Sequence, residues 1–415
     1  MKPQCLSLLL LALLVPTEVM AQRADLPPAD LVNRALDNHP GVKAAAARVA
    51  AARAHSDMLR HGSHEVTLSS SYTRRNVEGF GGRNEFDVTM SRAFRLPGKA
   101  ALDGQAGSLE IEVAKNKMED VRHQTALVLS GLWHDWLTAG SHYRNDLATV
   151  QDQEKALAAL RQRVTLRDAA ALDVDQASTA LAQARAQAAS SLAAREQARV
   201  TLAATFPDIA LPSRPRELAT PVLPSGGIVR MRTLVIERSH EIRAADRDAQ
   251  RLNVLSRRAR EDRIADPTVG VRMFSEQGGL EKGAGVIVSI PLGGGYRQAA
   301  ADQASAEASS AWQELANVRR TITAVANADL SNARTRLTAW RSADSAARSA
   351  GEAVIRIRRG YELGQINLSD LLYAQRQSNE MRRYEIDARG EADRALLKLQ
   401  IDSHSIWAPD EEPGQ

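Results

Sequence analysis

The stretch "VSIPLGGGYRQAAADQAS", residues 288–305, changes its pattern halfway along. Its first residues alternate apolar and polar side chains, which predicts a strand, whereas its alanine-rich end predicts a helix. A proline and three glycines separate the two parts. A similar passage, "MSRAFRLPGKAALDGQAG", occupies residues 90–107, at an offset of 198 residues. The chain is therefore predicted to pass from a strand into a helix twice, at corresponding places.

Two further pairs of segments repeat in the same order. Residues 39–54 resemble residues 239–253, and residues 170–180 align with residues 367–377 at an offset of 197. Each match is weak alone, but matches in constant order and at nearly constant offset predict an internal duplication.

Each half is predicted to contain a helix, two strands and two long helices. In the first half the helix spans about residues 29–59, and the strands flank the glycine-rich turn "RRNVEGFGGR". In the second half residues 268–274 and 284–290 flank "SEQGGLEKG". Each strand is expected to be about 8 to 11 residues long, with apolar side chains alternating along it. The sheet should therefore have one apolar face.

Two long stretches carry no proline, residues 99–166 and residues 296–363. At 1.5 Å per residue each would extend roughly 100 Å as a single helix, which a compact globule cannot accommodate. The helix that follows the first stretch repeats small and apolar residues at the spacing of a coiled-coil seam: Ala177, Leu181, Ala184 and Ala188. The sequence thus predicts thin, elongated helical pairs.

The chain is divided into five predicted regions. In order they are a signal peptide (1–21), a first structural repeat (22–205), a Pro-rich linker (206–227), a second structural repeat (228–403) and a C-terminal tail (404–415). The first region has a positive end, an apolar stretch and a small-residue cleavage site at Ala21, so export is expected. The only cysteine, Cys5, lies within it. The mature chain should therefore hold no disulfide, thiolate metal site or cysteine nucleophile.

The charge distribution and the absence of catalytic motifs exclude several classes of function. The 54 basic and 50 acidic side chains are interspersed, which is typical of solvated helix surface and disfavours a nucleic-acid partner. No serine-hydrolase, zinc-protease or phosphate-loop motif is present, so neither an enzyme nor a cofactor is expected. The histidine pairs His61/His64 and His134/His142 lack an accompanying carboxylate motif, and no metal site is predicted.

The strand-to-helix junctions "LPGK" and "IPLGGG", the duplication and the order of elements carry a family resemblance. They resemble the TolC family of outer-membrane efflux channels over residues 30–403. The segment "FRLPGK" and the short length of the chain most resemble those of the heavy-metal efflux subgroup, of the cobalt/zinc/cadmium or copper/silver type.

The resemblance implies a mainly α fold with a small β part. Three copies would form a homotrimer whose four strands per chain close a β-barrel of about twelve strands, because bacterial barrels start at about eight. Long antiparallel helices would continue it as an α-barrel into the periplasm. Such a protein is a passive exit duct for heavy-metal cations, embedded in outer-membrane lipid. Its implied partners are a periplasmic adaptor (membrane fusion) protein and an inner-membrane pump of the RND type.

The resemblance also assigns residues. The barrel junctions would be Pro97 and Gly98, and Gly293, Gly294 and Gly295. The tips that contact the adaptor would include Arg163, Leu166, Asp173, Arg359, Gly364 and Asp370. Asp370 is the pore-constriction candidate, with Tyr373 where some relatives place a second acidic residue. In the alternative interpretation, Asp173 and Asp370 only cap the returning helices.

Other functions stay open at this point. An outer-membrane channel for organic drugs or for type I protein secretion would share these features. A periplasmic structural coiled coil would have no pore, and its small sheet would pack on a helix. A secreted enzyme would need a convergent polar pocket.

Overall fold

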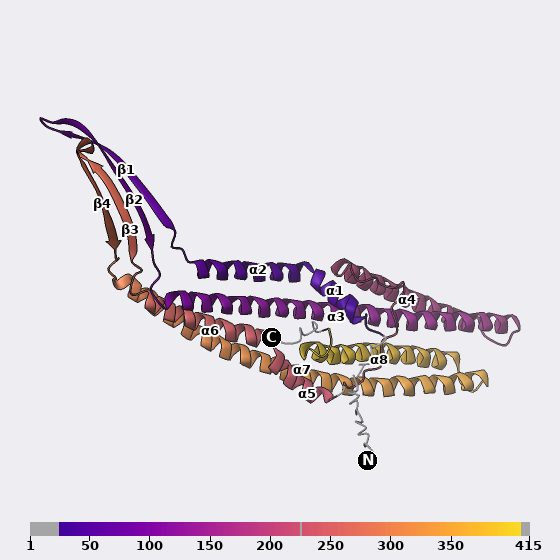
Figure 1. Ribbon diagram of the computed structural model, residues 1–415. Coiled ribbons are helices and arrows are strands. Elements are labelled where there is room, and N and C mark those ends of the chain that lie inside the picture. The colour runs from indigo at the N-terminus through magenta and orange to yellow at the C-terminus, as the bar shows by residue number, and fades with distance from the viewer. Residues whose placement is uncertain (1–24, 225, 408–415) are drawn as a thin grey trace, which may run out of the picture.

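The computed structural model describes residues 25–224 and 226–407. The predicted signal peptide, with Cys5, and most of the predicted C-terminal tail lie outside these residues. The described chain is elongated, with a sheet at one end and two helical hairpin tips at the other (Figure 1).

The two halves repeat one succession of elements. The first half runs α1 (Ala29–Asn38), α2 (Pro40–His61), β1 (Val66–Val77), β2 (Gly81–Ala93), α3 (Lys99–Thr165) and α4 (Ala171–Thr205). The second half runs α5 (Gly227–Arg238), α6 (His240–Glu261), β3 (Thr268–Glu276), the 3-10 turn η1 (Gln277–Gly279), β4 (Glu281–Ser289), α7 (Gly295–Glu362) and α8 (Leu368–Asp402). Helices α3 and α7 have 67 and 68 residues, and α4 and α8 have 35 each. The predicted fold class of long antiparallel helices with four strands is confirmed.

The first predicted helix is in fact two helices. The chain breaks at His39, which has an extended backbone (φ −61°, ψ 133°) because the residue before a proline avoids the helical region. Pro40 then begins α2, and the N–H of Gly41 donates to Nδ1 of His39 at 3.2 Å. In the second half Ser239 makes the corresponding break between α5 and α6, and its hydroxyl accepts from the N–H of Ile242 at 3.1 Å.

The first hairpin is longer than the sequence predicted. Strands β1 and β2 have 12 and 13 residues, while β3 and β4 have 9 each. Pairing in the first hairpin continues through Arg74 and Asn84 to its glycine-rich turn. Polar residues at the strand ends can pair their backbones as well as apolar ones, so the alternation of apolar residues underestimated the strand length.

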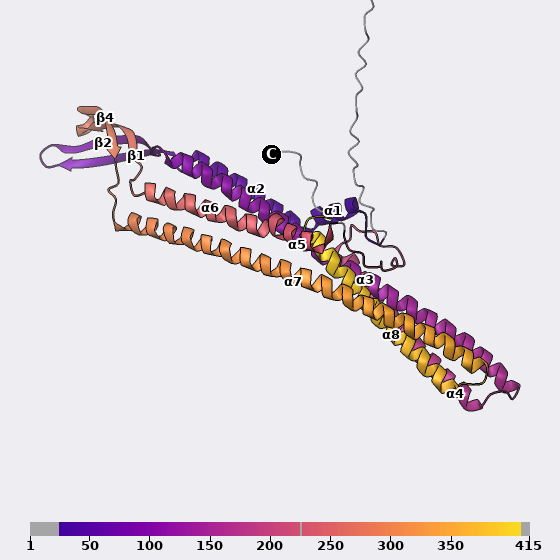
Figure 2. The same cartoon turned by 90° about the horizontal axis from the view of Figure 1, so that it is seen from below.

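The long helices α3 and α7 run most of the length of the molecule. Two shorter helices pack along each of them, one on each half of its length. Helix α2 lies along the part of α3 near the sheet, and α4 lies along the part near the tips (Figures 1 and 2). Helices α6 and α8 divide α7 in the same way. Contacts of α3 with both α6 and α8 join the two halves.

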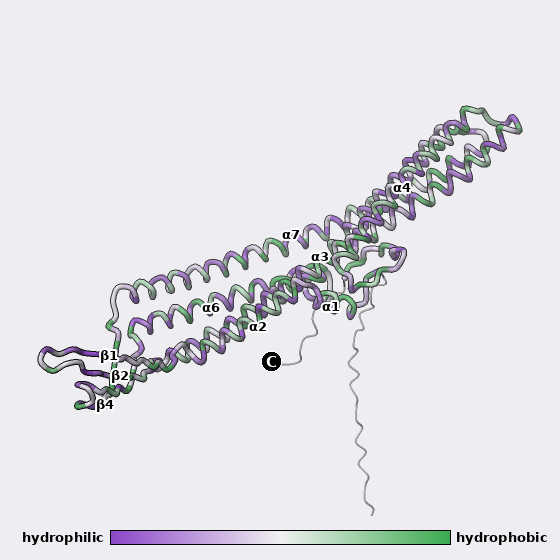
Figure 3. Tube along the Cα trace, turned by 90° about the horizontal axis from the view of Figure 1, so that it is seen from above, coloured by the Kyte–Doolittle hydropathy of each residue, from purple (hydrophilic) through white to green (hydrophobic). Residues whose placement is uncertain are grey.

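The largest apolar cluster of the described residues lies at mid-length, where α1, the Pro-rich linker and the segment 403–407 after α8 cover α3. Trp133 and Trp136 are buried there with ring centroids 5.3 Å apart, and Trp133 Nε1 donates to the carbonyl of Asp25 at 2.9 Å. Elsewhere hydrophobic and hydrophilic residues alternate along the helices (Figure 3). Among the described residues no helix is both long enough and apolar enough to span a membrane.

Candidate functional site

The sheet presents a continuous apolar face. Its strands pair antiparallel in the order β1-β2-β3-β4, and the register places Leu68, Met90, Val271 and Val286 in one row across it. The apolar face carries exposed side chains on all four strands: Val66, Leu68, Tyr72, Phe86, Val88, Met90, Val271, Met273, Val286 and Val288. Figure 1 shows the sheet projecting beyond the helices, so no helix of the described chain covers it.

The opposite face is mainly polar, although Phe274 and Ile287 also lie on it. It includes Thr67, Ser69, Ser71, Thr89 and Ser91, which alternate with the apolar residues along β1 and β2. Asp87 forms an ion pair with Arg272 across the strands, and Glu85 pairs with Arg75 at 3.1 Å. A four-stranded sheet with one apolar and one polar face, both uncovered, is suited to separate an apolar environment from water.

A buried lysine organises the first strand-to-helix junction. Lys99 is 1% exposed, and its Nζ donates to Asp266 Oδ1 at 2.8 Å and to the Ile264 carbonyl at 2.7 Å. Its Nζ also lies 3.0 Å from Asp262 Oδ1. The predicted junction residue Gly98 immediately precedes it with a φ of 92°, which only glycine adopts easily. The junction therefore ties the start of α3 to the end of α6.

Electrostatics explains why this junction tolerates buried charge. Burial would raise the pKa of Asp266, but hydrogen bonds from Lys99 and from the Leu96 N–H lower it overall. Hydrogen bonds from Arg258 and Lys99 likewise outweigh burial and lower the pKa of Asp262. Both carboxylates are thus held in their charged form, as a paired cluster requires. The motif "LPGK" gives no sign of this role for Lys99, because its carboxylate partners lie in the other half of the chain.

The second junction uses its glycines differently. A Cβ on Gly293 would lie 2.9 Å from the Arg263 carbonyl oxygen, so this position requires a close backbone approach. Gly294 is extended (φ −155°), a conformation open to any residue, and a Cβ on Gly294 or Gly295 would meet open space. None of the three glycines has a positive φ, so only Gly293, through its close contact, requires the absence of a side chain.

The first hairpin tip joins α3 to α4. Arg163 pairs with Asp168 at 2.8 Å, and its Nη1 donates to the hydroxyl of Tyr361 on the second tip at 3.2 Å. Leu166 is 78% exposed at the end of α3. Asp173 accepts from the N–H of Ala170 at 3.2 Å, so it caps α4 as the alternative interpretation expected.

The second tip joins α7 to α8. Arg359 pairs with Glu362 at 3.2 Å, and Gly364 adopts a φ of 72° in the turn. The cap of α8 is Asn367, whose side chain accepts from the Asp370 N–H at 2.8 Å. The expectation that Asp370 caps this helix is therefore wrong, because the residue three positions earlier has taken that role. Its carboxylate is exposed and, with Tyr373, lines a groove between α4 and α8.

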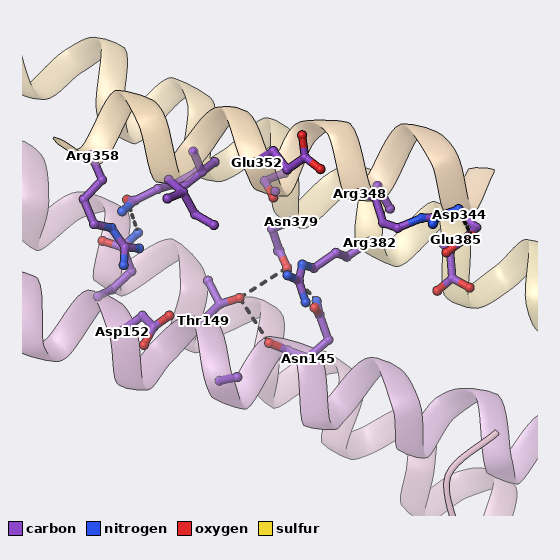
Figure 4. Close-up of a pocket in the computed structure, with 18 residues that line it drawn as sticks. Asn145, Thr149, Asp152, Asp344, Arg348, Glu352, Arg358, Asn379, Arg382 and Glu385 are labelled. Carbon is purple, nitrogen blue, oxygen red and sulfur yellow. Dashed lines mark hydrogen bonds and ion pairs between the residues drawn. The ribbon is translucent and has the colours of Figure 1, made fainter. Parts of the chain in front are cut away.

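A second polar groove lies between α3 and α7, with α8 as its floor. Figure 4 shows Asn145 and Thr149 of α3 directed toward Asn379 of α8. Asn145 Nδ2 donates to Asn379 Oδ1 at 2.6 Å, and Thr149 Oγ1 donates to the same atom at 3.2 Å. Charged residues of both signs line the groove, among them Asp152, Arg348, Glu352 and Arg382. Sequence reasoning could not find it, because it is formed by helices from both halves.

The four histidines of the two pairs noted in the sequence each contact a different partner. His64 Nε2 is 3.1 Å from Asp266, while His61 bonds the carbonyl of Asp57. His134 is buried against Asp393 at 2.8 Å, and His142 pairs with Asp387 at 2.7 Å. Within residues 25–224 and 226–407 no group of three or more ligating side chains is arranged to hold a metal ion.

Comparison with solved structures identifies the architecture. OprN, described as an outer-membrane channel, is 20% identical, and the match covers 92% of this chain and 90% of OprN with a TM-score of 0.76. CusC, described in terms of transmembrane channel formation, is 16% identical, with 90% and 91% covered and a TM-score of 0.73. The open state of the Neisseria gonorrhoeae MtrE outer membrane channel is 17% identical, with 90% and 88% covered and a TM-score of 0.70.

This chain has the outer-membrane channel fold. The likeness spans nearly the whole length of both chains, so the sheet, the long helices and the tips all belong to the channel fold. No protein-family model matches the sequence, and no curated protein is significantly similar to it.

Proposed function

We propose that this protein is a TolC-family exit duct, located in the bacterial outer membrane and extending into the periplasm. The observation that carries the proposal is the sheet, whose apolar and polar faces are both left uncovered by the chain that forms them. In a closed ring of three copies the apolar face would meet lipid and the polar face would line water. The duct would be passive, and an inner-membrane pump would supply the energy.

Reconstitution in a planar lipid bilayer tests this proposal. The purified protein should migrate as a heat-sensitive trimer in detergent and should produce discrete single-channel conductance steps. Replacing Leu68, Met90 and Val271 together by Lys places three charges per chain on the apolar face. The cost is about 2–4 kcal/mol for each lysine near the bilayer midplane, so insertion should be lost. A matched triple replacement of Ser69, Thr89 and Ser91 by Lys, on the polar face, should still insert. A monomer stable in plain buffer, without conductance, would refute the proposal.

The tips are proposed to dock the adaptor. Leu166 is exposed at the end of the first tip, and Arg163 joins the two tips through Tyr361, so the pair offers one continuous surface. A cysteine at Leu166 should form a disulfide cross-link with a cysteine-bearing adaptor tip. The same substitution at Val325, an exposed position on α7, should not. Equal cross-linking of both would contradict the assignment.

Asp370 is proposed to constrict the pore. Three exposed carboxylates around an axis attract cations and repel one another, which makes the aperture sensitive to divalent ions. The variant Asp370→Asn should change single-channel conductance and weaken block by divalent cations, while Asp208→Asn, at an exposed position of the Pro-rich linker, should not. Unchanged conductance and block in Asp370→Asn would remove Asp370 from this role.

Heavy-metal cations are the proposed cargo, on the strength of the sequence resemblance alone. In cells that lack their own duct, the protein should restore metal tolerance together with a heavy-metal pump and adaptor. Restoration of drug tolerance or of protein secretion instead would favour the alternative cargoes.

A further inference from the structure

A pocket lined by arginines lies where the helices meet the sheet. It lies between the end of α6 and the start of α7, is widely open to solvent, and has a volume of about 510 Å³. Three arginines line it, Arg260, Arg263 and Arg297, together with the backbone of Gly293 and Gly294. We call these three side chains and the space between them the arginine pocket.

Within the part of the chain that the structure describes, the three guanidinium groups have no carboxylate partner. Arg260 donates to the Ser305 hydroxyl at 3.3 Å, and Arg297 donates to the Asp262 carbonyl at 2.7 Å. The side chain of Arg263 makes no hydrogen bond or ion pair among the described residues. Ordinary surface arginines of this chain are often paired along their helix, as Arg348 is with Asp344. The arginine pocket therefore keeps most of its donor capacity unused.

Nearby acidic groups do not neutralise the pocket. The Asp262 carboxylate is shared by Lys99 and Arg258, and Asp302 accepts from the side-chain amide of Gln298. Glu261, which follows Arg260 in α6, forms no ion pair in the described chain. Against three arginines this leaves a net positive site.

Exposed apolar side chains lie in or next to the arginine pocket: Ile264 lines it, and Leu292 and Tyr296 flank its lining residues along the chain. Leu292 is 93% exposed just before α7, and Ile264 and Tyr296 are also largely exposed. Leu292 and Tyr296 follow β4, and Val288 of β4 and Ile290 just after it are exposed as well. A positive pocket bordered by exposed aliphatic and tyrosine side chains is the combination found where a protein meets a membrane surface.

We propose that the arginine pocket binds the phosphate-bearing headgroup of an anionic phospholipid. This inference rests on the proposed function, because a sheet in the membrane places the pocket at the membrane surface. Arginine forks suit phosphate oxygens, with which they form paired, charge-assisted hydrogen bonds. The acyl chains would lie along Leu292 and the apolar face of β4. We favour a lipid over free phosphate because acyl chains can cover the exposed apolar residues beside the pocket, whereas free phosphate cannot.

The test measures heat stability of the detergent-purified protein with three soluble probes. These are a short-chain phosphatidylglycerol, the matching phosphatidylcholine and inorganic phosphate. Phosphatidylglycerol should stabilise the protein at concentrations where the other two have little effect. The variant R260Q/R263Q/R297Q should need about a hundredfold more phosphatidylglycerol, since each arginine contributes about a factor of five near an anionic surface. The matched control R320Q/R334Q/R341Q removes three exposed arginines of α7 and should respond like the unmodified protein.

Three outcomes would overturn the inference. Equal stabilisation by phosphatidylcholine would indicate apolar contact only, and equal stabilisation by inorganic phosphate would indicate a free-anion site. An unchanged response of R260Q/R263Q/R297Q to phosphatidylglycerol would show that the arginine pocket does not bind the lipid. Conductance in a bilayer of neutral lipid separates this inference from the proposed function. Normal conductance without a preference for phosphatidylglycerol defeats only the lipid site, whereas absence of conductance defeats the duct.

Discussion

At the scale of single residues, Lys99 is the charge on which the junction depends most. Replacement by Met keeps the length of the side chain but leaves Asp262 and Asp266 without their shared cation. Removing one partner of a buried ion cluster costs about 3–5 kcal/mol, so Lys99→Met should lower the midpoint of thermal unfolding strongly. Lys43→Met is the matched control because Lys43 is exposed on α2. Equal midpoints for the two variants would show that the cluster contributes nothing to stability.

The sequence could predict the glycine of this junction but not its lysine. Gly98 follows a proline at the end of an alternating run, and that local pattern already indicates a turn. Lys99 acquires its role only from Asp262 and Asp266, more than one hundred and sixty residues away. Asp370 illustrates the same limit, since Asn367, three residues earlier, was an equally good cap and the sequence offered no way to choose between them.

At the scale of elements, close packing against Gly140 of α3 fixes the position of the Pro-rich linker. A Cβ on Gly140 would lie 2.0 Å from Cγ of Pro215, and Arg144 holds that proline by donating to its carbonyl at 2.9 Å. Gly140→Ala should therefore destabilise the protein by about 1–3 kcal/mol through overpacking. Gly131→Ala, in the same helix but facing open space, should instead stabilise it by up to about 1 kcal/mol. Denaturant unfolding measures both, and a gain in stability for Gly140→Ala would contradict the close packing.

Helix lengths were predictable because proline interrupts helices locally. The absence of proline between residues 99 and 166 correctly indicated α3. The break at His39 was missed although Pro40 indicated it, because proline is common in the first turn of a new helix and the residue before it avoids the helical region. The groove between α3 and α7 could not be predicted from the sequence, because the pairing of helices from the two halves leaves no local sequence pattern.

At the scale of the whole molecule, a cluster of histidines joins the two halves near the end of the chain. The ring of His404, which follows α8, stacks on His240 of α6 at 4.7 Å, and His123 of α3 lies 5.5 Å from it. Arg238 donates to the Ser403 carbonyl at 3.0 Å and holds this segment in place. Asp402 lies 3.1 Å from His123. The cluster thus connects the first half, the second half and the C-terminal segment.

This cluster should make the stability of the molecule depend on pH. Burial, helped by the charges of Arg243 and His123, lowers the pKa of His240 from 6.5 to about 4. Burial and the neighbouring His240, His123 and arginines lower the pKa of His404 from 6.5 to about 3. Below pH 6.5 these two histidines therefore bind protons in the unfolded chain but stay neutral in the folded chain. The free energy of unfolding falls as the pH is lowered, until the pH reaches the folded pKa values.

The midpoint of thermal unfolding should accordingly decrease between about pH 6.5 and pH 4. His404→Asn should reduce this decrease, because it removes one of the titrating groups while asparagine tolerates the positive φ of 52° at this position. The control His61→Asn changes a histidine at the end of α2 and should keep the pH profile of the unmodified protein. Because acidification also protonates carboxylates, the informative quantity is the difference between the two variants across this pH range. Parallel profiles for both would show that the histidine cluster does not link the halves in a pH-dependent way.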